Sequence, residues 1–348
     1  MIAAIRIASV AAALCLTSAA VAQDSVEQFY RGKTVTITVG SAVGGGYDAY
    51  ARLVARHLGR HIPGNPTIVV QNMPGAGSNR AASFVSLQAP KDGTTIGAIQ
   101  PAALLWPLLF NQPVQHDPSK LVMIGSANRD VYLCLVRSDT GVTSFKEVLS
   151  TREVIIGTAA EGTAIRDMPT LLVNVLGARF RLIGGYAGTR EILIAIERNE
   201  VHGICGMGWA SISMQNADWV KNGFLRILVQ EDLKGEPEVT RMGVPLSIEF
   251  AKTEEDRQVM QLIYSQSLFG RPYVLPPGVP AERVAVLRKA LLATLADKDL
   301  IADAVKSRLE LAAMSGEDMQ TLVARLYALP PQVVERAKRA LVYKPGAK

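Results

Sequence analysis

Residues 34 to 52 read Thr34-Val-Thr-Ile-Thr-Val-Gly-Ser-Ala-Val-Gly-Gly-Gly-Tyr-Asp-Ala-Tyr-Ala-Arg52. The first six residues are rich in β-branched side chains, which suits a strand buried on both faces. Gly44, Gly45 and Gly46 then let the backbone turn or approach a ligand closely, because they lack a Cβ. The apolar spacing after Asp48 predicts an amphipathic helix with an acid near its positive end. Free N–H groups at this helix start suit an anion, and a tight turn that binds nothing is the alternative.

The first 22 residues have the pattern of a secretory signal peptide. Arg6 is their only charge, a short apolar run follows, and Ala20-Val-Ala22 matches the small-x-small cleavage pattern. The apolar run is too short to span a membrane. Leu14 rather than a small residue precedes Cys15, which disfavours a lipid anchor there. We therefore expect cleavage after Ala22 and export of the remaining chain to the periplasm.

Length and charge narrow the class of protein further. A chain of 348 residues is long enough for one large or two medium domains with a sizeable core. Its formal net charge of +6 is mildly basic, and the charged residues are scattered along the chain. A nucleic-acid site would need clustered basic residues interleaved with aromatic ones. We therefore expect no nucleic-acid partner.

Beyond residue 24 the chain alternates predicted strands and helices, and the alternation restarts near residue 132. Such repetition predicts two α/β units, each with a parallel sheet covered on both faces. In open α/β sheets, ligands bind beyond the carboxyl ends of the strands, so the loops there are the informative ones. The predicted strands are 34–39, 67–71, 95–99, 121–125, 132–136, 154–157, 180–184, 201–207, 225–230 and 268–274. The predicted helices are 47–61, 79–88, 144–149, 164–176, 189–198, 254–266, 281–296, 298–306, 316–328 and 330–340.

The loop after the strand at 154–157 repeats the strand–turn–helix arrangement. Thr163 suits either a helix N-cap or a donor to a ligand oxygen. Arg166, on the first helical turn, suits either a bidentate pair with an anion or a solvated position. Glu161 would repel a carboxylate unless it points outward. In two later glycine-rich loops, Tyr186 is a candidate pocket wall, and Trp209 is either a cleft aromatic or a core residue.

The other chemistry-bearing residues do not form a catalytic set. The chain contains neither a Gly-x-Ser-x-Gly elbow nor a His-Glu-x-x-His zinc motif. Gly75-Ala-Gly77 starts like a dinucleotide fingerprint, but Arg80 occupies the third glycine position. His57 and His61 are four residues apart among arginines, which favours a solvated helix face over a metal site. We expect no enzyme, cofactor or metal.

Cys134 and Cys205 are the cysteines that remain after the signal peptide. Both lie in apolar, strand-like segments. In an oxidising compartment they can pair, but two cysteines do not make a disulfide scaffold. We expect two separately buried thiols.

Taken together, the loop motifs resemble the tripartite tricarboxylate transporter substrate-binding receptors, the Bug family. The resemblance spans essentially the whole mature chain, and it rests on the order and spacing of the motifs. They are Phe29-Tyr-x-Gly-Lys-Thr-Val, Gly44-Gly-Gly-x-Asp48-x-x-Ala-Arg52, Asn72-x-Pro-Gly-Ala-Gly77, Pro90-Lys-Asp-Gly-Thr94, Asp117-Pro-Ser-Lys120, Gly162-Thr163 and Val274-x-Pro-Pro-Gly-Val-Pro280.

The resemblance implies an α/β, type II periplasmic binding-protein fold, in which two Rossmann-like lobes close on a ligand cleft about a hinge. It implies a first lobe made of residues 23–129 and 246–348 and a second lobe made of residues 130–245. It implies a monomer that delivers a small organic acid to a membrane permease with one large and one small subunit. By matching position, it implies that the loops 41–48 and 158–163 hold the ligand carboxylate, through Ser41, Ala42, Gly45, Gly46, Tyr47, Asp48, Thr158, Ala159 and Thr163. Arg166, Tyr186 and Trp209 complete the predicted ligand-binding set from their own loops, although a histidine is common in the family at the position of Arg166.

Tyr47, Tyr186 and Trp209 suggest an aromatic or larger organic acid as the ligand. Two alternatives stay open. The same fold serves a sensory receptor that signals to a membrane kinase, and the sequence does not separate this role from transport. An exported α/β enzyme with a nucleotide cofactor would need a third glycine or an acidic ribose partner, and the sequence has neither.

Overall fold

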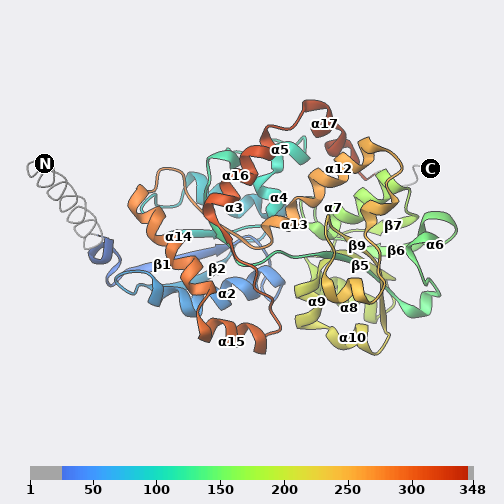
Figure 1. The fold of residues 1–348 in the computed structure, drawn as a ribbon, viewed down its shortest axis with the longest axis horizontal. Helices are drawn as coiled ribbons and strands as arrows, with labels where there is room; N and C mark the ends of the chain where they lie inside the picture. Colours follow the sequence, from blue (N-terminus) through green and yellow to red (C-terminus); the bar gives the residue numbers. More distant parts are fainter. Residues whose placement is uncertain (1–25, 344–348) are drawn as a thin grey trace, which may run out of the picture.

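The computed structural model describes residues 26–343, so the expected signal peptide lies outside the described residues. Figure 1 shows two α/β bodies side by side along the long axis of the molecule. The first contains a six-stranded sheet of order β11-β4-β10-β3-β1-β2, and the second a five-stranded sheet of order β7-β6-β8-β5-β9. The strands are β1 (Thr34–Val39), β2 (Thr67–Asn72), β3 (Thr95–Ala98), β4 (Val122–Ser126), β5 (Tyr132–Arg137), β6 (Val154–Gly157), β7 (Phe180–Ile183), β8 (Gly203–Gly208), β9 (Leu225–Glu231), β10 (Pro272–Leu275) and β11 (Met314–Ser315).

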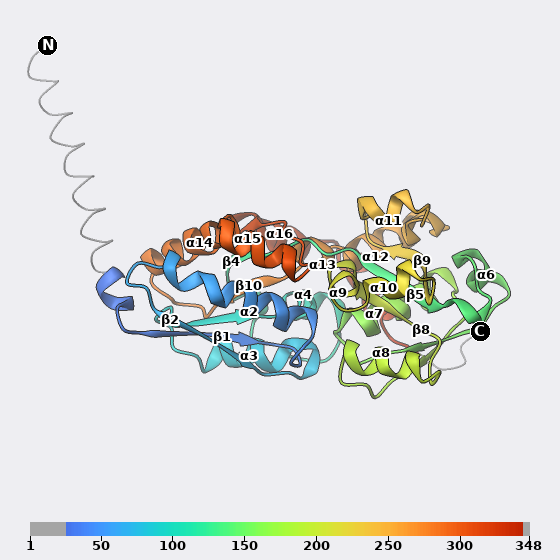
Figure 2. The same ribbon diagram turned by 90° about the horizontal axis from the view of Figure 1, so that it is seen from below.

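Helices cover both faces of the first sheet, with α2, α14 and α15 on one face and α3 and α16 on the other (Figures 1 and 2). The predicted helices are present, with ends shifted by a few residues. The segment predicted as the start of strand 268–274 instead forms a helical turn, α13, so β10 begins only at Pro272. The helices are α2 (Gly46–Leu58), α3 (Asn79–Leu87), α4 (Pro101–Leu104), α5 (Trp106–Leu109), α6 (Phe145–Ser150), α7 (Ala164–Leu171), α8 (Thr189–Glu197), α9 (Trp209–Gln215), α10 (Ala217–Lys221), α11 (Pro237–Arg241), α12 (Glu254–Tyr264), α13 (Gln266–Phe269), α14 (Ala281–Leu295), α15 (Lys298–Lys306), α16 (Gly316–Tyr327) and α17 (Pro331–Ala340).

The sheets are mixed rather than wholly parallel, which corrects the expectation from the sequence. β1 pairs in parallel with β2 and β3, as strands joined by crossover helices do. β10 lies antiparallel between β3 and β4, and β5 lies antiparallel between β8 and β9. Each of these two strands enters its sheet from the other lobe, so no crossover helix forces it to run parallel to its neighbours.

The chain leaves the first sheet after β4 and returns to it at β10, so its C-terminal part completes the first lobe. α14 packs on α2 and β4, and α15 packs on α2. The last helix, α17, contacts both α5 and α12. This arrangement is the two-lobe α/β fold that the motifs predicted, and the residue boundaries of the lobes stay a prediction.

One hydrophobic cluster is shared by the lobes. It extends from α3, α4 and α5 in the first lobe to β5, β6 and α7 in the second, with α12 and α17 between them. Separate clusters lie under α2 and α14 in the first lobe and under α8 and α9 in the second. The lobes are therefore tied together by buried apolar surface on the side of α12 and α17.

His57 and His61 do not lie on a solvated face, contrary to the prediction. His57 Nε2 lies 3.0 Å from Asp303 Oδ2, and His61 Nε2 lies 2.6 Å from Asp297 Oδ2. These acids belong to α15 and the residue before it, which pack against α2. The sequence around the histidines shows only the neighbouring arginines, because α15 is more than 200 residues away in the chain.

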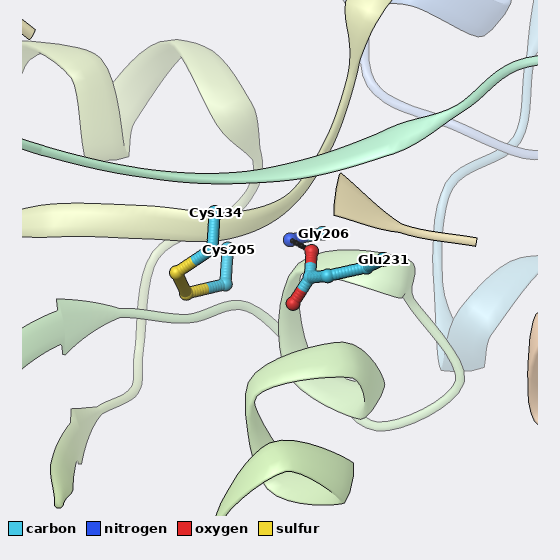
Figure 3. Close-up of a disulfide and its surroundings, with 4 residues drawn as sticks. All are labelled: Cys134, Cys205, Gly206 and Glu231. Atoms are coloured by element: carbon cyan, nitrogen blue, oxygen red, sulfur yellow. Dashed lines mark hydrogen bonds between the residues drawn. A yellow bond between two sulfur atoms is a disulfide. The ribbon is translucent and has the colours of Figure 1, made fainter. Parts of the chain in front are cut away.

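Cys134 and Cys205 form a disulfide, so the expectation of two separate thiols was wrong. They lie on β5 and β8, which are neighbours in the second sheet. The register of this antiparallel pair shifts between Leu133 and Leu135, and the shift brings the two side chains together. Figure 3 shows the disulfide on one face of these strands. Among the described residues, no helix is both long enough and apolar enough to cross a membrane.

Candidate ligand-binding cleft

A cavity of about 560 Å³ lies between the lobes, and its walls are loops at the carboxyl ends of strands. The first lobe contributes the loops after β1 and β2. The second lobe contributes the loops after β6 and β7 and the end of β8. This is the place where open α/β sheets bind ligands. The lining ranges are 40–43, 45–47, 74–78, 159–160, 163–165, 186–191 and 206–208.

Several helices start at this cavity, and their N-cap side chains make no capping hydrogen bond. The N-caps are Gly45 of α2, Thr163 of α7 and Gly188 of α8. The first amides of a helix have no intrahelical acceptor, and the helix dipole makes this end positive. The wall of the cavity therefore offers N–H donors from both lobes to a bound anion.

Acidic side chains behind the loops hold their shape. Asp48 accepts hydrogen bonds from the amide of Gly44 at 2.9 Å, from Arg52 Nε at 3.0 Å and from Asn72 Nδ2 at 2.9 Å. Burial raises the pKa of Asp48, but these hydrogen bonds together lower it by more. The pKa of Asp48 therefore lies below its ordinary value. Asp167, on the first turn of α7, accepts from the amide of Gly162 in the preceding loop at 3.1 Å. Burial raises the pKa of Asp167 well above the ordinary value. Both acidic side chains bind the outer part of a loop, and the helix starts beside them have no side-chain cap.

Eight of the residues predicted from the sequence line this cavity. They come from the loops after β1, β6 and β7, so the structure does bring loops of both lobes together. Their roles in binding stay predictions. The eight residues are Ser41, Ala42, Gly45, Gly46, Tyr47, Ala159, Thr163 and Tyr186.

The other four predicted residues lie behind the wall. Asp48 is buried under its loop. Thr158 Oγ1 donates to the carbonyl of Ile183 at 3.2 Å and accepts from Arg166 Nη1 at 3.3 Å. The guanidinium of Arg166 lies 5.1 Å from the ring of Tyr343 in the C-terminal segment. Trp209 is buried in the core of the second lobe.

Two polar side chains near the cleft have partners inside the protein. Thr163 Oγ1 donates to the carbonyl of Ala160 at 2.6 Å, so this hydroxyl is engaged within its own loop. Glu161 accepts from Gln112 Nε2 at 3.0 Å and does not line the cavity. The repulsion that Glu161 would exert on a bound carboxylate is therefore reduced by distance and by this partner.

Arg271 also lines the cavity, and the sequence analysis missed it. Its side chain is buried, forms an ion pair with Asp130 and lies with its guanidinium carbon 4.2 Å from the centre of the Tyr47 ring. Burial alone would lower the pKa of Arg271, but Asp130 and the nearby tyrosines raise it above the ordinary value, so the guanidinium is charged. Because Arg271 is far from the glycine-rich loops in the chain, no local motif marks it.

Tyr132 and Ser211 are two further lining residues without a sequence signal. Burial raises the pKa of the Tyr47 and Tyr132 phenols, which interact with each other. A Cβ at Gly46 would lie 2.4 Å from Ser211 Oγ and 3.1 Å from Arg271 Nη2. The close approach of the α2 start to the second lobe therefore favours glycine at this position, because a larger residue would displace Ser211 and Arg271.

Glu231 lies behind the floor of the cavity, next to the disulfide (Figure 3). Its Oε2 accepts from the amide of Gly206 at 2.6 Å, and Gly206 lines the cavity. Burial raises the pKa of Glu231 to about 8, despite this hydrogen bond. Glu231, Cys134 and Cys205 are close enough together to resemble a metal-ligand cluster. The sulfur atoms of Cys134 and Cys205 are bonded to each other, however, so neither is available as a thiolate ligand.

Comparisons with known proteins give the following relatives. No protein-family model matches the chain. The chain is 30% identical over 186 residues to the UPF0065 protein in the TAR-I ttuE-ttuC' intergenic region of Agrobacterium vitis, and this match spans 51% of each chain. The chain therefore spans about half the length of this relative.

Solved structures match over almost the whole chain. The periplasmic binding protein BugD has a TM-score of 0.69 and 23% identity, with 89% of this chain and 98% of BugD covered. MatC from Rhodopseudomonas palustris, solved with malate, has a TM-score of 0.67 and 20% identity, with 89% and 99% covered. Rpa4515 from R. palustris, solved with adipate, has a TM-score of 0.68 and 22% identity, with 89% and 97% covered. The resemblance expected from the motifs is confirmed at the level of the fold: this chain has the two-lobe α/β fold of the Bug-type periplasmic binding proteins.

Proposed function

We propose that this protein is a periplasmic solute-binding receptor that captures a small organic acid between its lobes. The observation that carries the proposal is the convergence of helix starts from both lobes, without side-chain caps, on one cavity of about 560 Å³. Such starts bind anions without a cofactor or a metal. MatC and Rpa4515 support the choice of a carboxylate, because they were solved with malate and adipate.

The ligand carboxylate binds at the starts of α2 and α7, which face the cavity from opposite lobes. Backbone amides of Gly46 and Tyr47, the hydroxyl of Ser41 and bridging waters are its partners. Ser41 Oγ is buried and has no hydrogen-bond partner among the described residues, so a ligand oxygen would satisfy it. Tyr47 and Tyr186 form apolar walls for the body of the ligand. Asp48, Thr158 and Arg166 act from behind, by holding the loops.

The lobes, residues 23–129 with 246–348 and residues 130–245, close on the ligand about the two chain crossings. The closed receptor then delivers its ligand, as a monomer, to a membrane permease with one large and one small subunit. The transport role and the subunits rest on the resemblance to the Bug family.

A thermal-shift screen of the mature protein tests the proposal. The panel contains monocarboxylates, dicarboxylates, aromatic acids and amino acids at millimolar concentration, with uncharged amides of the same acids as controls. A ligand at 100 times its Kd adds about 2.7 kcal/mol to the free energy of unfolding, which is a readily measured rise in Tm. Absence of a shift with every acid, or equal shifts with the amides, would argue against a carboxylate receptor.

A further inference from the structure

Arg271 lines the cleft and carries a buried donor without a partner in the part of the chain that the structure describes. The side chain is 3% exposed, and its Nε has no hydrogen-bond partner among the described residues. Its Nη2 is bound to Asp130 Oδ2, and the guanidinium stacks near the rings of Tyr47 and Tyr50, at 4.2 and 5.2 Å. A buried donor without a partner is costly unless a ligand or water satisfies it.

The positive charge of Arg271 is already balanced. Asp130 is also buried, and its other oxygen accepts from the amide of Ala210 at the start of α9, at 3.2 Å. The ion pair is therefore fixed at the place where the chain passes between the lobes. The other charged residues that line the cavity, Arg190 and Glu191, are exposed and of opposite sign. The side chains at the Arg271 end of the cleft therefore carry no net positive charge that would attract an anion.

We propose that the Arg271–Asp130 pair makes this receptor select monocarboxylic acids that carry a neutral acceptor, a hydroxyl or carbonyl oxygen, at the end opposite the carboxylate. This inference rests on the proposed function, because it assumes that the carboxylate binds at the starts of α2 and α7. The neutral oxygen binds the free Nε–H of Arg271. The nearby hydroxyls of Tyr47, Tyr132 and Ser211 add polar contacts, and the tyrosine rings suit an aromatic or planar ligand body.

A second carboxylate at this end is disfavoured by charge and by solvation. It would lie beside the carboxylate of Asp130, and like charges in a partly buried site repel strongly. It would also lose its water shell without gaining an unpaired cation in return. A hydroxyl or carbonyl oxygen loses less hydration and still accepts the Nε–H bond.

Isothermal titration calorimetry on the mature protein with matched ligands tests the selectivity. One pair is 4-hydroxybenzoate and terephthalate, and the other is 4-hydroxybutyrate and succinate. In the pair whose ring or chain fits the cleft, we expect the hydroxy acid to bind at least tenfold more tightly than the dicarboxylate. Equal or tighter binding of the dicarboxylate would overturn the selectivity and leave the receptor function intact. If no acid binds in these titrations or in the wider panel, the receptor function itself fails.

Asp130→Asn provides the complementary test. Asparagine keeps an oxygen for the amide of Ala210 but removes the negative charge, so the guanidinium of Arg271 gains an unbalanced charge. We expect the ratio of dicarboxylate to hydroxy-acid affinity to rise at least tenfold. Asp232→Asn is the matched control, because Asp232 is another buried acid, paired with Arg129 at 3.2 Å, that does not line the cavity. An unchanged ratio in folded Asp130→Asn would overturn the inference, and the wild-type ligand ranking decides the matter if this variant does not fold.

Discussion

Asp48 lies behind the cleft loop rather than inside the cleft, so its carboxylate shapes the binding surface without needing to touch a ligand. It joins the amide of Gly44, Arg52 and Asn72, which come from the loop, from α2 and from the end of β2. The sequence places an acid at a positive helix end, and such an acid suits either a ligand contact or a capping role. The distances now favour the second role.

Asp48→Ala should therefore lower both stability and ligand affinity. The substitution leaves the amide of Gly44 and the side chain of Asn72 without their acceptor, which costs about 1–3 kcal/mol of unfolding free energy. Denaturant unfolding and calorimetry with the best ligand of the screen measure the two effects. Thr163→Ala is the comparison, because its hydroxyl bonds only within its own loop. A loss of affinity in Asp48→Ala without any loss of stability would contradict this account.

Glu231 should make the stability of the protein depend on pH. Its folded pKa of about 8 lies above the ordinary value of 4.5, so the folded state holds a proton that the unfolded state releases between these values. The free energy of unfolding should then fall as pH rises from about 4.5 through about 8. Glu231→Gln keeps an oxygen for the amide of Gly206 and cannot titrate. Its Tm should fall less than that of the wild type between pH 5 and pH 8.5, and parallel curves would exclude this role.

At the scale of elements, the cleft is built from one unit used repeatedly: a strand, a glycine-containing loop and a helix start. Neighbouring parallel strands bring these loops to the same edge of a sheet, so the local pattern predicts which loops meet. The pattern does not predict how β5 and β8 pair, because β5 enters the second sheet from the other lobe. Their antiparallel register is what joins Cys134 to Cys205.

The disulfide between β5 and β8 should add to the stability of the second lobe. It closes a loop with a sequence separation of 71, which corresponds to about 4 kcal/mol in the chain-entropy model. Denaturant unfolding with and without a phosphine reductant should show this difference. The double variant Cys134→Ala with Cys205→Ala should not respond to the reductant. Alkylation of both cysteines in the unreduced, denatured protein would disprove the bond.

At the scale of the whole molecule, the lobes meet across the mouth of the cleft as well as along the shared core. A Cβ at Gly77 of the first lobe would lie 2.8 Å from the Cα of Gly162 in the second. The two loops that carry these glycines both belong to the cavity region. The lobes can therefore lie this close together only while the backbones at Gly77 and Gly162 remain in contact.

Gly77→Ala should hold the lobes apart and weaken ligand binding by about tenfold, a loss of about 1.4 kcal/mol. Gly177→Ala is the matched control. Both residues have positive φ, +56° and +77°, so both pay a similar backbone cost, but a Cβ at Gly177 meets nothing within 4 Å. Calorimetry measures the affinity, and small-angle scattering with ligand measures closure. Equal affinities in the two variants would show that this contact does not matter for closure.

The sequence by itself determined the features that depend on neighbours in the chain. The β-branched runs, the glycine loops after them and the amphipathic spacing specify strands, turns and helix starts, and these local signals predicted two α/β units with a cleft between them. The order and spacing of the motifs, through the resemblance to the Bug family, added the two-lobe fold and several of the eight lining residues. Only the tertiary structure decided which distant side chains meet: Arg271 with Asp130 and Tyr47, Cys134 with Cys205, and His57 with Asp303. The physical reason is that these contacts depend on sheet order and on where the chain crosses between lobes. Both are set by the packing of the complete molecule and leave no periodic or local trace in the residues concerned.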